Sequence, residues 1–308
     1  MLPATRAAAD GGRYPGAVSS GSSEGMGPSQ DTGLVYALGT LGYDFGTEAR
    51  RDTFKQLMPP ARFGETLVPA NPHDNRQMVD YLAANPSESK ALIWTLNLEL
   101  TPIYAVEPVG PFGHHVYNVL RELLTGEVEA EHVETYIERV SVPGQLSGRT
   151  ARLFSGQVVP VIELGNVRGL YGWRTSALIK AAIAEIGAEK VDEARVRRTL
   201  EGFLNRVYYD LRNLGATARD RALNFAATNA FQAATTFTRA IGEGMELDTT
   251  TVERSPICRL DSDCWDVKLK FFDPENDRRA KRVFRFTIDV SDSIPVTLGE
   301  VRTWTEAN

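Results

Sequence analysis

Two cysteines, Cys258 and Cys264, are the residues whose type and spacing most readily suggest chemistry. They are the only cysteines of the chain, and they enclose a short polar segment of five residues. Two thiolates this close in sequence can bind one metal ion, and zinc would need two further nitrogen or sulfur ligands. The sequence therefore predicts a candidate zinc site, to which histidines must contribute.

His114 and His115 are the best candidates among the four histidines, and they lie on a helix predicted after Pro111. Neighbours on a helix point about 100° apart, so at most one of the two is expected to join the cysteines. Four protein ligands would make the zinc structural, whereas three ligands and a water would make it catalytic. The alternative is a pair of free, partly buried cysteines and two ordinary surface histidines.

Two other polar groups have simpler interpretations. Asp261, Asp263 and Asp266 alternate as calcium ligands can, but the glycine and the bidentate glutamate of an EF-hand loop are absent, so a solvated turn is favoured. A second group contains tyrosine and arginine side chains of the kind that dock peptides. The exposed face of an amphipathic helix explains it more simply. Its members are Asn97, Glu99, Tyr104, Asn205, Arg206, Tyr208, Tyr209, Asp210 and Arg212.

Most of the common catalytic motifs are absent from the sequence. It contains no G-x-x-x-x-G-K-[ST] loop, no G-x-G-x-x-G between a strand and a helix, and no H-E-x-x-H. His132-Val133-Glu134 matches the first half of a zinc deaminase motif, but the spacing of the two cysteines does not match its second half. We therefore predict no catalytic and no cofactor-binding residue other than the zinc ligands.

The composition is that of a globular protein. Of 308 residues, 42% are hydrophobic and 24% are charged, and 34 Lys and Arg against 40 Asp and Glu give a net charge of −6. This balance argues against a nucleic-acid-binding domain, which needs a concentrated basic face. No apolar run approaches the ~18–20 residues of a membrane span, and the first residues lack the apolar stretch of a secretory signal. We expect a cytoplasmic protein with no nucleic-acid or membrane partner.

The chain divides into three predicted regions. Residues 1–31 are rich in Ala, Gly, Ser and Pro and carry almost no large apolar side chain, which predicts a disordered linker or tail. Residues 32–150 are predicted to form an N-terminal α+β subdomain. Residues 151–308 are predicted to form a C-terminal subdomain with long helices and a terminal β-hairpin, although no clear linker separates the two.

Hydrophobic periodicity predicts the elements of the first half. Alternation over residues 93–106 places Trp94, Leu96, Leu98 and Leu100 on one face and predicts a single half-buried strand. Pro160 places its own strand at a sheet edge or beside a bulge. The other predicted elements are a strand over 34–45, helices over 47–58, 74–84 and 111–126, and two or three strands within 140–171.

The second half is predicted to be helical first and β afterwards. Apolar stripes predict helices over 178–186, 196–214 and 217–241, and alanines on the last stripe predict that the last two helices form an antiparallel hairpin. Alternation over 265–271 and 284–290 predicts a β-hairpin. Strands and helices come in blocks, so the expected fold is α+β, with antiparallel sheet elements, a helical hairpin and a C-terminal β-hairpin.

Several long strings resemble the C-terminal region of cyanobactin maturation proteases of the PatA and PatG type. They are YALGTLGYDFG at 36–46, LIWTLNLELTPIYAVEPVGP at 92–111, DRALNFAATNAFQ at 220–232 and SPICRLDSDCWDV at 255–267. In that family the region follows a subtilisin-like protease domain, which in PatG-type members also macrocyclises ribosomal precursor peptides. The resemblance implies a domain of unassigned function, and no Asp-His-Ser set with subtilisin context is visible in this chain.

The resemblance and the missing catalytic set together predict an accessory, non-catalytic domain of cyanobactin-type ribosomal peptide biosynthesis. Its expected partner is a precursor peptide or the subtilisin-like maturation protease, and a structural zinc at Cys258 and Cys264 would stabilise it. One alternative is a metal-dependent tailoring enzyme of unknown reaction. The other is an oligomerisation module, in which the alanine-lined helical hairpin pairs between chains.

Overall fold

Strand β1 (Leu34–Asp44) begins the described part of the chain and pairs with two different strands along its length. The computed structural model describes residues 33–174, 213–232, 245–276 and 278–307, with the isolated residues 176, 177, 180, 194 and 198. The predicted linker at 1–31 lies outside the described residues. From Thr32 onwards the chain forms one compact unit.

Five strands close into a barrel. Leu34–Gly39 of β1 pair with β6, and Thr40–Asp44 pair with β4, so the ring runs β1-β4-β5-β7-β6 and returns to β1. All pairs are antiparallel except β5 with β7. With a helix between its third and fourth strands, this is the connectivity of five-stranded Greek-key barrels of the OB type. The strands are β4 (Ile93–Leu98), β5 (Thr101–Pro108), β6 (Arg139–Arg152) and β7 (Val158–Leu164), and β8 (Tyr171–Trp173) adds to β6.

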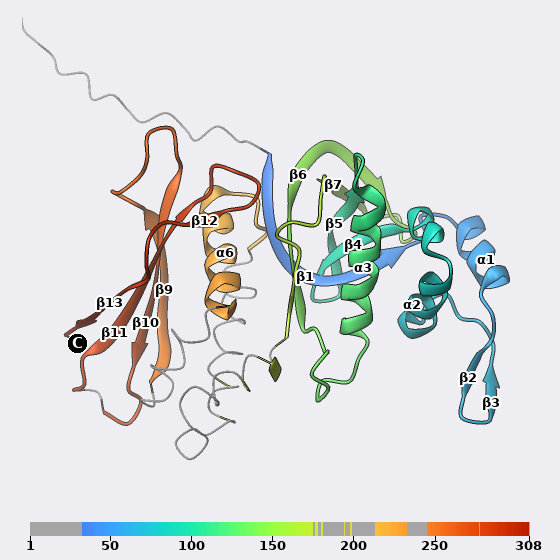
Figure 1. Cartoon of the computed structure of the whole chain (residues 1–308), viewed down its shortest axis with the longest axis horizontal. Helices are drawn as coiled ribbons and strands as arrows, with labels where there is room; N and C mark the ends of the chain where they lie inside the picture. The colour runs from blue at the N-terminus through green and yellow to red at the C-terminus, as the bar shows by residue number, and fades with distance from the viewer. Residues whose placement is uncertain are drawn as a thin grey trace, which may run out of the picture. The chain divides into compact units, whose positions relative to one another are not determined.

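β1 curves between its two partner strands, β6 and β4 (Figure 1). Two glycines in β1 make this curve possible. A Cβ at Gly39, where the pairing changes, would overlap the Asn97 carbonyl oxygen of β4. A Cβ at Gly42 would lie 2.6 Å from the Asn97 side-chain nitrogen. The strand therefore needs glycine at position 39 for its close approach to the β4 backbone, whereas a Cβ at position 42 would require the Asn97 and Thr95 side chains to move.

The long connection from β1 to β4 and the helix after β5 cover the barrel. Thr47 and Asp74 cap two helices of this connection, because their side chains accept from Arg50 N at 3.3 Å and from Arg76 N at 2.9 Å. The capped helices match the predictions over 47–58 and 74–84. The elements are α1 (Glu48–Leu57), β2 (Ala61–Phe63), β3 (Thr66–Val68), α2 (Asn75–Ala84), the 3₁₀ helix η1 (Pro86–Ala91) and, after β5, α3 (Gly113–Glu127).

One prediction about strands needs correction, and another is confirmed in one of its two forms. Residues 93–106 form a hairpin of two strands rather than one, because Glu99 adopts a left-handed conformation (φ 57°) and turns the chain, which leaves Leu100 97% exposed. Apolar and polar residues continue to alternate through this turn, so the sequence pattern alone does not indicate it. β7 is not an edge strand, since it pairs on both sides, but the predicted irregularity exists: the register of β6 against β7 shifts between Leu146 and Thr150, and Thr150 faces Pro160.

β1 supplies alternate side chains to two hydrophobic cores, as the period of two requires. Val35 and Ala37 pack with the barrel strands and helices α2 and α3. Tyr36 and Leu38 pack with helix α6 (Ala218–Gln232) and the C-terminal sheet. α6 thus lies between β1 and that sheet (Figure 1).

α6 confirms the predicted third helix as far as Gln232, and residues 233–241 of the prediction lie outside the described residues. Thr217 Oγ1 accepts from Asp220 N at 3.1 Å at its start. Its side chains from Arg221 to Asn224 and from Ala226 to Thr228 are buried, so it is covered on more than one face. The partner helix predicted over 196–214 and the helix over 178–186 lie almost wholly outside the described residues. The helical hairpin, and oligomerisation through it, therefore stay predictions.

The C-terminal sheet contains the predicted β-hairpin. Its strands β10 (Cys264–Phe272) and β11 (Lys281–Asp289) pair in register, and Val267, Leu269 and Phe271 are fully buried against α6. The sheet is larger than the hairpin, because β9 (Glu246–Arg254) pairs with β10, and β12 (Val296–Thr297) and β13 (Arg302–Glu306) pair with β11.

Residue 150, where the sequence suggested a subdivision, falls inside β6. β7 and β8, which belong to the segment after that residue, complete the first sheet. No helix in the described ranges is long and apolar enough to cross a membrane.

Candidate functional site

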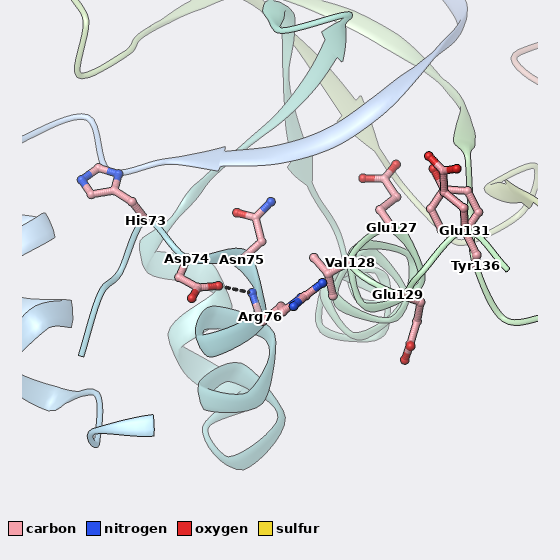
Figure 2. A pocket seen from close by; sticks show the side chains of 9 residues that line it. All are labelled: His73, Asp74, Asn75, Arg76, Glu127, Val128, Glu129, Glu131 and Tyr136. Carbon is pink, nitrogen blue, oxygen red and sulfur yellow. Dashed lines mark hydrogen bonds between the residues drawn. The ribbon is translucent and has the colours of Figure 1, made fainter. Parts of the chain in front are cut away.

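A polar cavity of about 530 Å³ lies between the start of α2 and the end of α3 (Figure 2). One apolar residue, Val128, contributes to its lining. The polar lining residues are His73, Asp74, Asn75 and Arg76 from the α2 side, and Glu127, Glu129, Glu131 and Tyr136 from the α3 side. Pockets of this size accommodate small ligands, or a few residues of a peptide.

The N-terminal cap of α2 positions one wall. The Asp74 carboxylate accepts from Arg76 N at 2.9 Å and from the Gln77 side chain at 3.4 Å. The His73 ring packs edge-on against Phe45, with the ring centroids 5.2 Å apart. This wall is therefore held by local hydrogen bonds and one aromatic contact, while the Arg76 side chain stays exposed.

The end of α3 positions the opposite wall. Both carboxylate oxygens of Glu127 accept from Leu41 N of β1, at 3.0 and 2.9 Å. After the helix the chain folds back, because Ile137 N donates to the Gly126 carbonyl at 3.0 Å, and this return brings Tyr136 to the cavity. A Cβ at Gly126 would lie 2.5 Å from the Ile137 side chain, so the absence of a side chain at Gly126 helps this close return.

The ionisation of the α3 wall is unusual. Burial raises the pKa of Glu127 to about 8, although the hydrogen bond from Leu41 and the charge of Arg139 lower it. Burial also raises the pKa of Tyr136, and the charges of Glu131, Glu138 and Glu127 raise it further, while Arg139 lowers it. Burial thus holds back the ionisation of both groups, and at Tyr136 the neighbouring carboxylates add to its effect.

The charges lining the cavity are unequally divided. Three carboxylates, those of Asp74, Glu129 and Glu131, face one guanidinium and one imidazole, while Glu127, with its pKa of about 8, is largely protonated near neutral pH. In Figure 2 Glu127, Glu131 and Tyr136 lie at one end and His73, Asp74 and Asn75 at the other, with Arg76 between them. The arrangement offers many hydrogen-bonding groups of mainly negative charge.

Catalytic geometry is not evident in this cavity. Its lining includes no Ser, Thr or Cys nucleophile. Within the part of the chain that the structure describes, Glu127 hydrogen-bonds to the Leu41 backbone rather than to another lining side chain. The cavity is therefore better suited to binding than to nucleophilic catalysis.

The four predicted zinc ligands are not gathered at one place. Cys258 and Cys264 form a disulfide, with their Cα atoms 5.5 Å apart, and disulfide sulfurs carry no thiolate charge for zinc. His114 and His115 are exposed on the first turn of α3, in the barrel half. Across the described ranges no three His, Cys, Asp or Glu side chains form a metal-binding group. Zinc binding by the reduced cysteines stays a prediction.

The other candidate groups bind separate partners. Asp261 is exposed in a left-handed turn (φ 64°), whereas the Asp263 carboxylate accepts from Trp265 Nε1 at 3.0 Å. Asp266 is 1% exposed, and its carboxylate accepts from Thr287 Oγ1 at 2.7 Å. Tyr104 donates to the Leu214 carbonyl at 3.0 Å. Of the other members of its predicted group, Asn97 lies in β4 and Glu99 in the turn after it, and those at 205–212 lie outside the described residues.

The residues that line the cavity were not predicted from the sequence. They are mostly exposed polar residues at the ends of two helices, where hydrophobic periodicity gives no signal. The one local sign is the run Glu127-Val128-Glu129-Ala130-Glu131, which places three carboxyl groups at alternate positions from the last residue of a helix onwards.

Comparison with known proteins gives consistent results. Residues 34–148 match a family model described as "PatG Domain", and residues 190–304 match one described as "PatG C-terminal". A solved structure described as "PatG Domain of Unknown Function" is 54% identical, with a TM-score of 0.80, and the match covers 89% of this chain and 99% of that one. No curated protein matches the sequence.

Proposed function

Because the chain belongs to the PatG-type family of domains of unknown function from cyanobactin maturation proteins, we propose that it is an accessory binding module. It recognises a peptide segment, from a precursor peptide or from the partner maturation protease, and does not itself cut or join the peptide. The observation that carries the proposal is the polar cavity between α2 and α3.

The cavity suits a peptide better than an apolar small molecule. Eight of its nine lining residues are polar, whereas sites for small apolar ligands are lined mainly by hydrophobic and aromatic side chains. Main-chain amides and polar side chains of a peptide find both donors and acceptors there, from Asn75, Arg76 and Tyr136 and from the carboxylates.

The charge of the lining indicates which peptides bind best. Glu129 and Glu131 are exposed at the cavity, and no described ion pair involves either of them. Their charge favours a segment with lysine or arginine side chains, or with a free amino terminus. Such an attraction weakens as salt screens it.

Titration calorimetry with synthetic precursor peptides and with the maturation protease tests the proposal. We expect binding that the double variant Glu129→Gln/Glu131→Gln weakens by about three- to tenfold, since each exposed charge contributes up to about 1 kcal/mol. Glu275→Gln, in the turn between β10 and β11, is the matched control and should leave the affinity unchanged. Absence of binding to peptide and protease at high micromolar concentration would overturn the proposal.

One observation favours the alternative of a tailoring enzyme. A carboxyl group with a pKa of about 8 beside a cavity, such as Glu127, is suited to proton transfer near neutral pH. The mass of linear and cyclic precursor peptides after incubation with the protein distinguishes the two functions. A changed mass that Glu127→Gln abolishes supports the enzyme, and an unchanged mass supports the binding module.

A further inference from the structure

The connection between β9 and β10 contains a disulfide whose two sulfurs have different surroundings. Cys258 lies in the exposed part of the connection, whereas Cys264, the first residue of β10, is 3% exposed. A reagent in solution can therefore reach the disulfide from the Cys258 side.

Hydrogen bonds that do not involve the sulfur atoms hold the base of this connection. Ser255 N donates to the Cys264 carbonyl at 2.9 Å, and Val290 N donates to the Asp263 carbonyl at 2.9 Å. Asp263 N donates to Ser291 Oγ at 2.8 Å. These bonds, with the pairing of β9 and β10, keep the base in place whether or not the disulfide is present.

The tip of the connection, residues 256–262, has much weaker support. Ile257 is 58% exposed and Leu260 is 92% exposed, and Asp261 adopts a left-handed conformation. The tip's own hydrogen bonds are mostly local: Ser262 N donates to the Arg259 carbonyl at 3.2 Å, and Ser255 Oγ accepts from Ile257 N at 3.3 Å and donates to the Ile257 carbonyl at 3.1 Å. The Ser262 side chain also hydrogen-bonds to Asp289 of β11. The covalent ring from Cys258 to Cys264 ties the Cys258 end of the tip to β10.

We propose that Cys258–Cys264 is a thiol–disulfide exchange site for a dithiol reductant, and that its redox state sets the conformation of the tip. One thiolate of the reductant attacks Cys258 Sγ and forms a mixed disulfide, and the bond to Cys264 breaks. The bonding electrons leave with Cys264 Sγ, which then takes a proton. The second thiol of the reductant loses its proton and displaces Cys258 as a thiolate, which is protonated in turn.

The net reaction converts one protein disulfide and one dithiol into two protein thiols and one oxidised reductant, so two electrons pass to the protein. Exposed disulfides are the labile ones, and dithiol reductants are plentiful in the cytoplasm. Reduction frees residues 256–262 and leaves the hairpin paired. The exposed side chains of Ile257 and Leu260 then lose their fixed positions.

The test follows alkylation and proteolysis of the full chain. The native protein is treated with dithiothreitol, alkylated with iodoacetamide, and analysed by mass spectrometry for two modified cysteines. In parallel, trypsin cleavage after Arg259 is timed, and we expect reduction to accelerate it by about tenfold, because local opening controls cleavage. Cleavage after Arg278, in the turn between β10 and β11, is the internal control and should not change.

In the Cys258→Ser variant, trypsin should cleave after Arg259 as fast as in the reduced wild type, with or without dithiothreitol. The circular dichroism of the variant should match that of the wild type. The proposal is overturned if the cysteines react only after denaturation. A cleavage rate after Arg259 that does not respond to reduction would equally contradict it.

Discussion

Two polar regions of this molecule differ in how their polar groups are satisfied. Along α6, Asn224 donates to the Tyr36 carbonyl at 2.7 Å, and Arg221 donates to the Val290 carbonyl at 3.0 Å. Ser141, fully buried, accepts from Trp173 Nε1 at 2.7 Å and lies 2.9 Å from Thr228 Oγ1. These groups are buried and bonded to the protein itself.

In the cavity between α2 and α3 the polar groups remain available. Arg76, Glu129 and Glu131 are exposed there. A concentration of polar residues therefore has two meanings in the same chain. Along α6 the polar side chains bond to the protein's own backbone and hold β1, α6 and the C-terminal sheet together. In the cavity the polar side chains have free hydrogen-bonding capacity, so they can bind a ligand.

The largest expected effect comes from breaking the α6 network. Asn224→Ala removes the hydrogen bond to Tyr36 and leaves that buried carbonyl unsatisfied, and it also removes contacts with Asn213. We expect the free energy of unfolding to fall by about 3 kcal/mol, measured by urea denaturation.

Asn166→Ala is the matched control, because within the described residues this exposed amide only accepts from Arg168 N at 2.8 Å. Its cost should stay below about 0.5 kcal/mol. Similar losses for the two variants would mean that the α6 network is not a structural element.

The next effect concerns the point where β1 changes partner. Gly39→Ala forces a methyl group onto the Asn97 carbonyl, so β1 and β4 must move apart. A loss of about 2 kcal/mol is expected in the same denaturation experiment. Gly165→Ala, which would meet nothing within 4 Å, should be close to neutral, and equal effects would contradict the close approach at Gly39.

Stability should also depend on pH through Glu127, the one cavity residue that bonds to β1. Its pKa rises from 4.5 in the unfolded chain to about 8 in the fold, so between these values the folded state holds the extra proton. The free energy of unfolding therefore falls as pH rises through this window. We expect a loss of about 2 kcal/mol between about pH 6 and pH 7.5, measured by urea midpoints.

Glu127→Gln should flatten this dependence, because its amide oxygen still accepts from Leu41 N but does not ionise. Glu129→Gln, exposed at the same cavity, should keep the wild-type profile. A wild-type midpoint that does not change across the window would contradict the buried state of the Glu127 carboxyl.

The smallest effect on stability should come from the cavity itself. Arg76 is exposed, and only its backbone nitrogen helps to cap α2. Arg76→Ala should change the unfolding free energy by less than about 0.5 kcal/mol while altering peptide affinity in calorimetry. A large loss of stability would show that the Arg76 side chain is a structural element, as the α6 network is, and would contradict its assignment to ligand binding.

Local patterns predicted the elements well where one face is buried. The alternation of Val267, Leu269 and Phe271 identified β10, and Thr47 and Asp74 marked two helix starts. The turn at Glu99 was missed because apolar residues continue to alternate across it. The closure of the barrel was also missed, since it depends on the pairing of β1 with β6, more than 100 residues later in the sequence.

The candidate site was predicted less well. The proximity of Cys258 and Cys264 was correctly suspected, but their pairing is a disulfide. Sequence spacing cannot distinguish thiolates around a metal from two bonded sulfurs, because both need the same short separation. The cavity depends on the packing of the start of α2 beside the end of α3. No local sequence pattern in either helix predicts this packing.

The position of β1 has a consequence for synthesis on the ribosome. Tyr36 bonds to Asn224, which is 188 residues further along the chain. At 5–20 residues per second, the first strand emerges about 10–40 s before the helix that covers it. During that interval the Tyr36 and Leu38 face has no α6 to cover it, so a nascent chain stalled before α6 should recruit chaperones that bind exposed apolar strands.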